Sequence, residues 1–250
     1  MSIFNQAAEL VRSSQRITAF TGAGISVESG IPPFRGEGGL WEKYDPGYLE
    51  INYFRAHPAK SWPVIKEIFY DFFGSARPNA AHLALAELEK KEILQTVITQ
   101  NIDNLHQAAG SKEVYEFHGN SQYLICDNCA GRYHVSQINL DELPPCCRQC
   151  GGLLKPDFVF FGETVPQEVY SKAVLEAQMS DLFILIGTTG EVMPAALIPP
   201  LAKSNGTSIL EINVEPSNYT DRISDIFIRA KATEGMTGLM QALGISFVSD

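Results

Sequence analysis

The sequence lacks an excess of basic residues. It holds 19 lysine and arginine residues against 29 aspartate and glutamate residues, which gives a net charge of −10. A protein that binds nucleic acid without sequence preference needs a basic face, so we expect no direct nucleic-acid partner. The charge suits a basic ligand such as a lysine-rich protein segment, although an acidic surface can also serve solubility alone.

Long hydrophobic runs are also missing. The longest dense apolar stretch, LFILIG, is far shorter than the roughly 20 residues that span a bilayer. Residues 1–16 show neither a basic start nor an unbroken apolar run, and their apolar positions fall on one helical face. We therefore expect no membrane partner and a cytoplasmic protein, as a monomer or a weak oligomer.

Cysteine is absent outside one window, CDNCAGRYHVSQINLDELPPCCRQC at residues 126–150. A disulfide framework would spread its cysteines along the chain. Two C-x2-C pairs separated by seventeen residues instead have the spacing of a zinc site. The predicted ligands are Cys126, Cys129, Cys147 and Cys150. Four thiolates leave no open coordination position, so the zinc is expected to be structural.

Two neighbouring residues are alternatives to this ligand set. Cys146 precedes Cys147, but pairing Cys147 with Cys150 keeps the two-residue gap and places Gly151-Gly152 directly after the turn. Cys146 is then a spare thiol. His134 lies between the pairs and could bind the metal, although a lone histidine is more often an ordinary polar residue.

The rest of the chain alternates apolar strands with amphipathic helices. This pattern predicts an α/β fold with a doubly wound, Rossmann-like parallel sheet. Asn79 is placed to cap the helix NAAHLALAELEKK, and Pro166 to open the helix PQEVYSKAVLEAQM. The expected strands are RITAFT (16–21), TVITQN (96–101), VYEFHG (114–119), DFVFFG (157–162), LFILIGT (182–188), SILEINV (208–214) and IFIRA (226–230).

Two segments interrupt the alternation and are expected to form a smaller lobe. Residues 32–76 are rich in aromatics and prolines and predict a flap and a helical insertion, and residues 123–155 form the four-cysteine zinc module. The nucleotide-binding domain would then comprise residues 1–31, 77–122 and 156–250.

Polar groups follow several of the strands, in TQNIDNLH, EFHGN, GTTGE and EINVEP. Ligands bind at the carboxyl ends of parallel strands, so these groups can converge on one cleft. For any single residue, helix capping explains a strand-end asparagine or threonine equally well. The loop TGAGISVESGIPPFRG also begins like a dinucleotide loop, but Val27 stands where a third glycine is expected and Pro32-Pro33 ends the helix.

These residues together resemble the sirtuin family of NAD-dependent protein lysine deacylases. The shared motifs are GAGIS (22–26), SGIPPFRG (29–36), TQNID (99–103), FHG (117–119), KPDFVFFGE (155–163), GTT (187–189), INVE (212–215) and the two zinc pairs. Thr189, Pro33 and Phe158 depart from the family's usual residues, and none of these changes removes a catalytic group.

The resemblance implies a protein deacetylase that uses NAD as co-substrate and releases nicotinamide, O-acetyl-ADP-ribose and free lysine. His118 would act as general base, and Asn101 and Asp103 would orient the nicotinamide ribose. The implied NAD contacts are Gly22, Ala23, Gly24, Ser26, Phe34, Arg35, Trp41, Gln100, Asn101, Ile102, Asp103, Gly187, Thr188, Thr189, Asn213, Val214, Glu215 and Ala232. The implied contacts to the acetylated lysine segment are Val159, Phe160, Gly162, Glu163 and Met193.

The resemblance also bears on the acyl group. Sirtuins that prefer succinyl-lysine carry a tyrosine and an arginine in the helical insertion, and the matching positions here are Ile65 and Ile68. Two alternative functions stay open: mono-ADP-ribosylation on the same scaffold, distinguished by whether label from NAD ends on protein, and a non-catalytic zinc-ribbon interaction module, which the histidine and both polar partners argue against.

Overall fold

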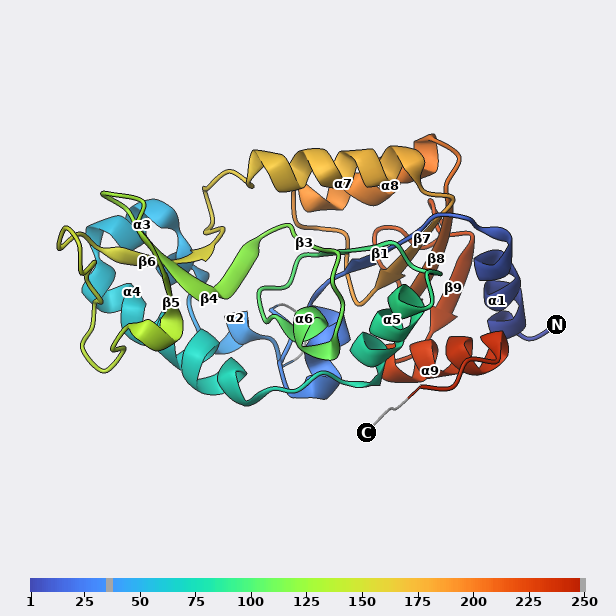
Figure 1. Cartoon of the computed structure of the whole chain (residues 1–250), viewed down its shortest axis with the longest axis horizontal. Helices are drawn as coiled ribbons and strands as arrows, with labels where there is room; N and C mark the ends of the chain where they lie inside the picture. The colour runs from blue at the N-terminus through green and yellow to red at the C-terminus, as the bar shows by residue number, and fades with distance from the viewer. Residues whose placement is uncertain (35–37, 248–250) are drawn as a thin grey trace.

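The computed structural model describes residues 1–34 and 38–247 and shows two lobes of unequal size along its long axis (Figure 1). The larger lobe holds a parallel sheet with the strand order β3-β2-β1-β7-β8-β9. Its strands are β1 (Ile17–Thr21), β2 (Thr96–Thr99), β3 (Val114–Glu116), β7 (Leu182–Ile186), β8 (Ser208–Asn213) and β9 (Ile226–Arg229). The predicted doubly wound α/β class is confirmed.

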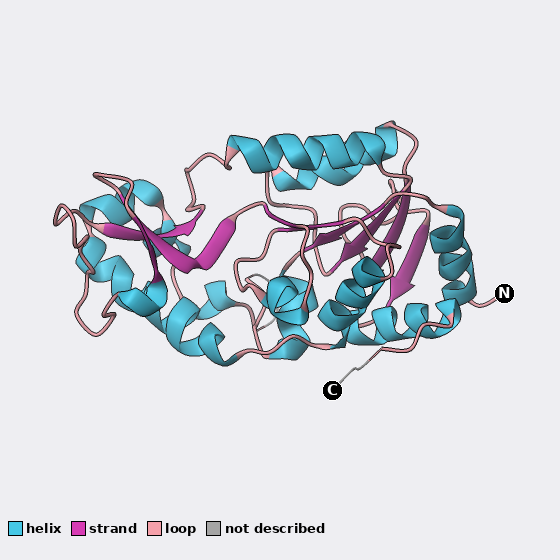
Figure 2. Ribbon diagram, viewed as in Figure 1, coloured by secondary structure: helices cyan, strands magenta, loops and turns pink. Residues whose placement is uncertain are grey.

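Helices cover both faces of this sheet (Figure 2). Alternate residues of β7 show why: Leu182 and Ile184 pack in the cluster formed with α1 (Ile3–Ser13), α5 (Ala80–Lys90) and α9 (Ala232–Leu243). Phe183 and Leu185 belong to the opposite cluster, with α7 (Gln167–Met179) and α8 (Ile198–Ser204). A strand buried on both faces must be apolar at every position, as LFILI is.

Local signals set several helix ends. The side chain of Asn79 accepts a hydrogen bond from the amide of Ala81 at 3.0 Å, so the expected cap of α5 is present. Pro166 lies one position earlier than expected, at the cap of α7. A further short helix, α6 (Leu105–Ala109), follows β2. Within the described residues, no helix has both the length and the apolar character that a membrane crossing requires.

The smaller lobe joins the helical insertion to the cysteine-rich segment. The insertion contains α2 (Leu40–Lys43), α3 (Ile51–Ala56), α4 (Pro58–Ile65) and a π-helical turn (Lys66–Phe72). The cysteine-rich segment adds an antiparallel sheet, β5-β4-β6, built from β4 (Gly119–Cys126), β5 (Arg132–His134) and β6 (Leu154–Phe158). Both parts share one core, in which fully buried Trp62 donates from Nε1 to the carbonyl of Leu154 at 3.0 Å.

The expected strand at residues 157–162 is wrong in place and in partner. Only its first two residues belong to a strand, β6, which pairs antiparallel with β4 in the small lobe. Phe158 and Phe160 stack with ring centroids 5.1 Å apart inside the small-lobe core. An apolar run of this kind signals burial on both sides, and here the burial comes from a second core instead of the main sheet.

Candidate active site

A cavity of about 770 Å³ opens where the two lobes meet, at the carboxyl ends of β1, β2, β7 and β8. This volume is within the usual range of small-molecule sites, roughly 300–1,000 Å³. Most residues implied for NAD line it: Gly22, Ala23, Gly24, Phe34, Trp41, Gln100, Asn101, Ile102, Gly187, Thr188, Thr189, Asn213, Val214, Glu215 and Ala232. All five residues implied for the substrate line it too, as does His118.

The glycine loop is held against the end of β7. The amides of Gly22 and Gly24 donate to the carbonyls of Ile186 and Gly187 at 3.0 and 2.9 Å. A Cβ on Gly24 would lie 2.5 Å from the Cα of Gly187, closer than atoms can approach. These glycines are therefore needed for close backbone packing, and their own N–H groups are already hydrogen-bonded to β7 and the residue after it.

His118 follows β3 and lies on the cavity wall with one ring nitrogen fixed. Its Nδ1 lies 2.9 Å from the carbonyl oxygen of Gln100. A carbonyl only accepts, so Nδ1 carries the proton and Nε2 keeps its lone pair. Burial lowers the pKa of His118 below its ordinary value, and the bond to Gln100 opposes this only in part. The imidazole is therefore neutral at pH 7, the state that a general base requires.

Asn101 lines the cavity directly, whereas Asp103 lies behind it. The amide nitrogen of Asn101 donates to the carbonyl of Gly22 at 3.1 Å and to the hydroxyl of Ser26 at 3.2 Å. Ser26 in turn donates to Asp103 at 2.7 Å. The second oxygen of Asp103 accepts a hydrogen bond at 3.0 Å from the amide of Leu105, the first residue of α6. Asn101 lines the cavity, whereas Ser26 and Asp103 form its support from behind.

Two buried histidines, which the sequence reasoning missed, continue this support. His106 Nε2 lies 2.9 Å from the hydroxyl of Thr21, and the rings of His82 and His106 are 4.9 Å apart. Burial lowers the pKa of His82 to about 4, so it is neutral at pH 7. Their only sequence signal is a histidine within an otherwise apolar helical face, which predicts core packing equally well.

The far end of the cavity is polar and more exposed. Gln100 donates to the hydroxyl of Thr188 at 3.0 Å, and Asn213 donates to the carbonyl of Thr188 at 3.0 Å. Glu215, expected to hold a ribose, forms an exposed ion pair with Arg229 at 2.6 Å. The Glu215 carboxylate keeps further lone pairs beside this ion pair, so it can still accept a hydroxyl.

The flap after the glycine loop presents aromatic rings to the cavity. The rings of Phe34 and Trp41 lie 5.3 Å apart, and Trp41 lies 6.0 Å from Phe161. Arg35, also expected to contact NAD, is outside the described residues. The aromatic cluster gives this wall of the cavity an apolar surface.

The segment from Val159 to Glu163 runs along the cavity beside the histidine. Val159 donates from its amide to the carbonyl of His118 at 2.8 Å, and Phe161 donates to the carbonyl of Leu49 at 2.9 Å. Gly162 has φ of +87°, a left-handed conformation that favours glycine. Met193, which also lines the cavity, is 61% exposed.

The helical insertion contributes cavity residues that the sequence did not reveal, notably Leu49 and Phe69. They come from short helical turns with many apolar residues. The local sequence pattern cannot distinguish an apolar residue that lines the cavity from one that packs in the core. Ile65 and Ile68, the positions matched to the succinyl-binding pair, are buried in the small-lobe core. They are not among the residues that line the cavity.

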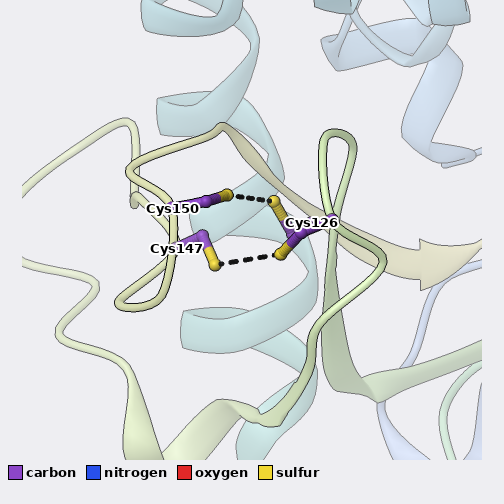
Figure 3. A group of neighbouring side chains, drawn as sticks. Cys126, Cys147 and Cys150 are labelled. Atoms are coloured by element: carbon purple, nitrogen blue, oxygen red, sulfur yellow. Dashed lines mark hydrogen bonds between the residues drawn. The ribbon is translucent and has the colours of Figure 1, made fainter.

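The four predicted cysteines converge on one point in the small lobe, as three labelled residues show in Figure 3. The sulfurs of Cys126, Cys129, Cys147 and Cys150 all lie within 4.8 Å of one another. Paired sulfurs are 3.5 and 3.6 Å apart, and a tetrahedral zinc with Zn–S bonds of about 2.3 Å needs a separation near 3.8 Å. The donor set fits zinc.

Residues around the cluster take other roles. Cys146 is exposed and donates to the carbonyl of Pro144 at 3.7 Å, outside the cluster. His134 caps the next turn, because its Nδ1 accepts a hydrogen bond from the amide of Ser136 at 3.3 Å. The hydroxyl of Tyr133 lies 3.1 Å from Cys147 and lowers the pKa of that thiol to about 6. This bond favours the thiolate that binds metal.

A parallel sheet with a glycine loop and a zinc module beside one cleft defines a nucleotide-binding α/β protein. The Sir2 family model matches residues 22–194, and the chain belongs to the Sir2 family. A Pyrobaculum aerophilum protein named NAD-dependent protein deacylase 2 is 47% identical, with 94% of this chain and 93% of the relative covered.

Other relatives agree with this assignment. NAD-dependent protein deacylase of Pyrococcus furiosus is 42% identical, with 96% of this chain and 98% of the relative covered. Among solved structures, a complex described as "Sir2-p53 peptide-NAD+" matches with a TM-score of 0.90 and 35% identity, covering 98% of this chain and all of that one.

Proposed function

We propose that this chain removes acetyl groups from lysine side chains of proteins in an NAD-dependent reaction that gives nicotinamide, O-acetyl-ADP-ribose and free lysine. The observation that carries this proposal is His118 on the cavity wall, with Nδ1 bound to Gln100 and Nε2 left as the base. Relatives named deacylases and a solved Sir2 complex with a deacetylated peptide and 3'-O-acetyl-ADP-ribose support the substrate class.

The residues divide the chemistry among them. NAD, as co-substrate, supplies a ribose carbon that takes the acyl oxygen and a nicotinamide leaving group. His118 accepts a proton from a ribose hydroxyl at Nε2, since burial keeps it neutral. Asn101 orients the nicotinamide ribose, and Ser26 and Asp103 hold Asn101 in place. Phe34 excludes water from the ribose carbon, and Arg35 is assigned to the same flap.

The segment beside His118 is assigned to the peptide. Val159, Phe160, Gly162 and Glu163 contact the chain that carries the acetyl-lysine, with Met193 on the opposite side. The net charge of −10 favours lysine-rich partners. We assign the protein to the cytoplasm as a monomer or weak oligomer, with no nucleic-acid or membrane partner.

The test is turnover of an acetyl-lysine peptide with NAD, followed by mass spectrometry. The expected products are deacetylated peptide and O-acetyl-ADP-ribose in equal amounts, and none should form without NAD. Transfer of label from NAD to the protein, without loss of acetyl groups, would assign the site to ADP-ribosylation instead.

A further inference from the structure

A partly buried ion pair lies within residues 155–163, the stretch that includes the residues assigned to the substrate peptide. Lys155, on β6, has a side chain only 7% exposed, and its ammonium donates to the carboxylate of Glu163 at 3.0 Å. The same ammonium donates to the carbonyls of Pro156 and Phe158 at 2.9 and 2.7 Å. Lysine has three N–H donors, so its full donor capacity is used inside this one loop.

The carboxylate of Glu163 completes the connection. The oxygen that binds Lys155 also accepts the amide of Phe160 at 2.8 Å. The ammonium lies 4.4 Å from the ring centre of Phe160, within the range of a cation–π contact. Two charged groups therefore bridge the start, middle and end of residues 156–163. Phe160 and Glu163 themselves line the cavity.

Stability alone is a poor reason for this pair. Burying the ammonium of Lys155 carries a desolvation cost, and an apolar replacement of similar volume is often as stable as a buried ion pair. Burial lowers the pKa of Lys155 despite its partner Glu163, which shows that desolvation outweighs their attraction. The pair does, however, fix the backbone between Phe158 and Glu163, and in the middle of that stretch Val159 donates to the carbonyl of His118.

We propose that Lys155 is a positioning residue for the acylated peptide. Together with Glu163 it holds residues 159–163 in the conformation that receives the substrate chain, without touching the substrate itself. This inference rests on the proposed deacylation at the same cavity. Most residues assigned to NAD follow β1, β2, β7 and β8, outside residues 156–163, so NAD binding should not depend on Lys155.

The test replaces Lys155 with methionine, which keeps the length of the side chain and removes every donor. Lys155→Met should raise KM for an acetyl-lysine peptide by roughly 10- to 100-fold, as expected when hydrogen bonds to charged groups are lost. KM for NAD should stay at the wild-type value. Lys172→Met is the matched control, because Lys172 forms an exposed pair with Glu168 on α7, and it should change neither constant.

Two further measurements distinguish a loss of positioning from a general destabilisation of the fold. Hydrogen exchange in Lys155→Met should rise in residues 156–163 and stay unchanged in the main sheet. Lys155→Met/Glu163→Gln should be no worse than the poorer single variant, because the two groups act as one unit. If Lys155→Met fails to fold, hydrogen exchange of Glu163→Gln without peptide decides, because Glu163 also lines the cavity. Exchange should then rise in residues 156–163, and unchanged exchange there would overturn the inference.

Two results overturn the inference: an unchanged peptide KM, or equal rises in KM for peptide and for NAD. A wild-type protein that does not deacetylate the peptide overturns the proposed function instead. In that case hydrogen exchange still decides whether Lys155 holds the segment.

Discussion

Burial governs the chemistry of the individual residues around the cavity. It lowers the pKa of His118 and raises the pKa of Asp103, although the amide of Leu105 and the hydroxyl of Ser26 oppose the second shift. The histidine stays neutral and ready to accept a proton, while the aspartate, which Ser26 and the Leu105 amide hold, serves as an anchor. Two titratable groups thus take separate roles because of their surroundings.

The pH dependence follows from the first of these shifts. A general base works only when neutral, and its lowered pKa moves protonation to more acidic pH. We expect the acid limb of kcat/KM for the peptide to have its midpoint below the ordinary histidine value, about 6.5. A pH profile at saturating NAD measures it. A midpoint above that value would contradict the assignment of His118 as a buried base.

Removing the imidazole should separate binding from chemistry. His118→Ala should fold and bind NAD as the wild type does, and lose deacetylation by on the order of 100-fold or more, as for a general base. Calorimetry with NAD and peptide turnover measure the two properties. His134→Ala, which changes an exposed capping residue, is the control and should keep full turnover. Near-normal activity of His118→Ala would exclude the role.

At the scale of elements, the zinc turns stabilise the small lobe. Cys147→Ala should release zinc and destabilise that lobe, since metal binding is coupled to folding. Cys146→Ala should keep its zinc, because Cys146 lies outside the cluster. Metal analysis of the two purified variants compares neighbouring cysteines directly. Retention by Cys147→Ala together with loss by Cys146→Ala would reverse the ligand assignment.

The helical insertion bears on acyl selectivity. Ile65 and Ile68, which the resemblance matched to the tyrosine and arginine of succinyl-selective sirtuins, are both buried. Among the residues of segment 32–76 that the structure describes, those that line the cavity include no cation to pair with a carboxylate: Pro33, Phe34, Trp41, Leu49 and Phe69. An unpaired buried carboxylate costs several kcal/mol, so kcat/KM for acetyl-lysine should exceed that for succinyl-lysine by roughly 100-fold or more.

One peptide carrying acetyl-, butyryl- or succinyl-lysine gives the comparison. Butyryl-lysine is the control for size, because it adds length without charge. A succinyl value equal to the acetyl value would mean that a cation reaches the cavity.

The sequence predicted the elements best where local chemistry was decisive. The alternating pattern gave the main sheet, Asn79 gave a helix start, and the cysteine spacing gave the zinc cluster. It failed at residues 157–162, because an apolar run shows that a segment is buried but not which core buries it. It could not reveal Leu49, Phe69 or Lys155 either, since their positions depend on contacts between segments far apart in the chain.

At the scale of the whole molecule, the arrangement of the apolar cores predicts which part of the protein unfolds first. Two apolar clusters flank the parallel sheet, and the third belongs to the small lobe and includes Cys126 and Cys147. Chelation of zinc should therefore open the small lobe while the sheet stays folded. Hydrogen exchange with and without a chelator measures this, and returned zinc should restore protection. Uniform exposure of both lobes would contradict it.

The bond from Trp62 to Leu154 joins residues 92 positions apart within that third core. Neither the helical insertion nor the cysteine-rich segment has a complete apolar interior of its own. A chimaera that takes only one of them from a relative would set mismatched surfaces against each other. Anyone who wishes to graft a different substrate range onto this scaffold should therefore exchange both segments together.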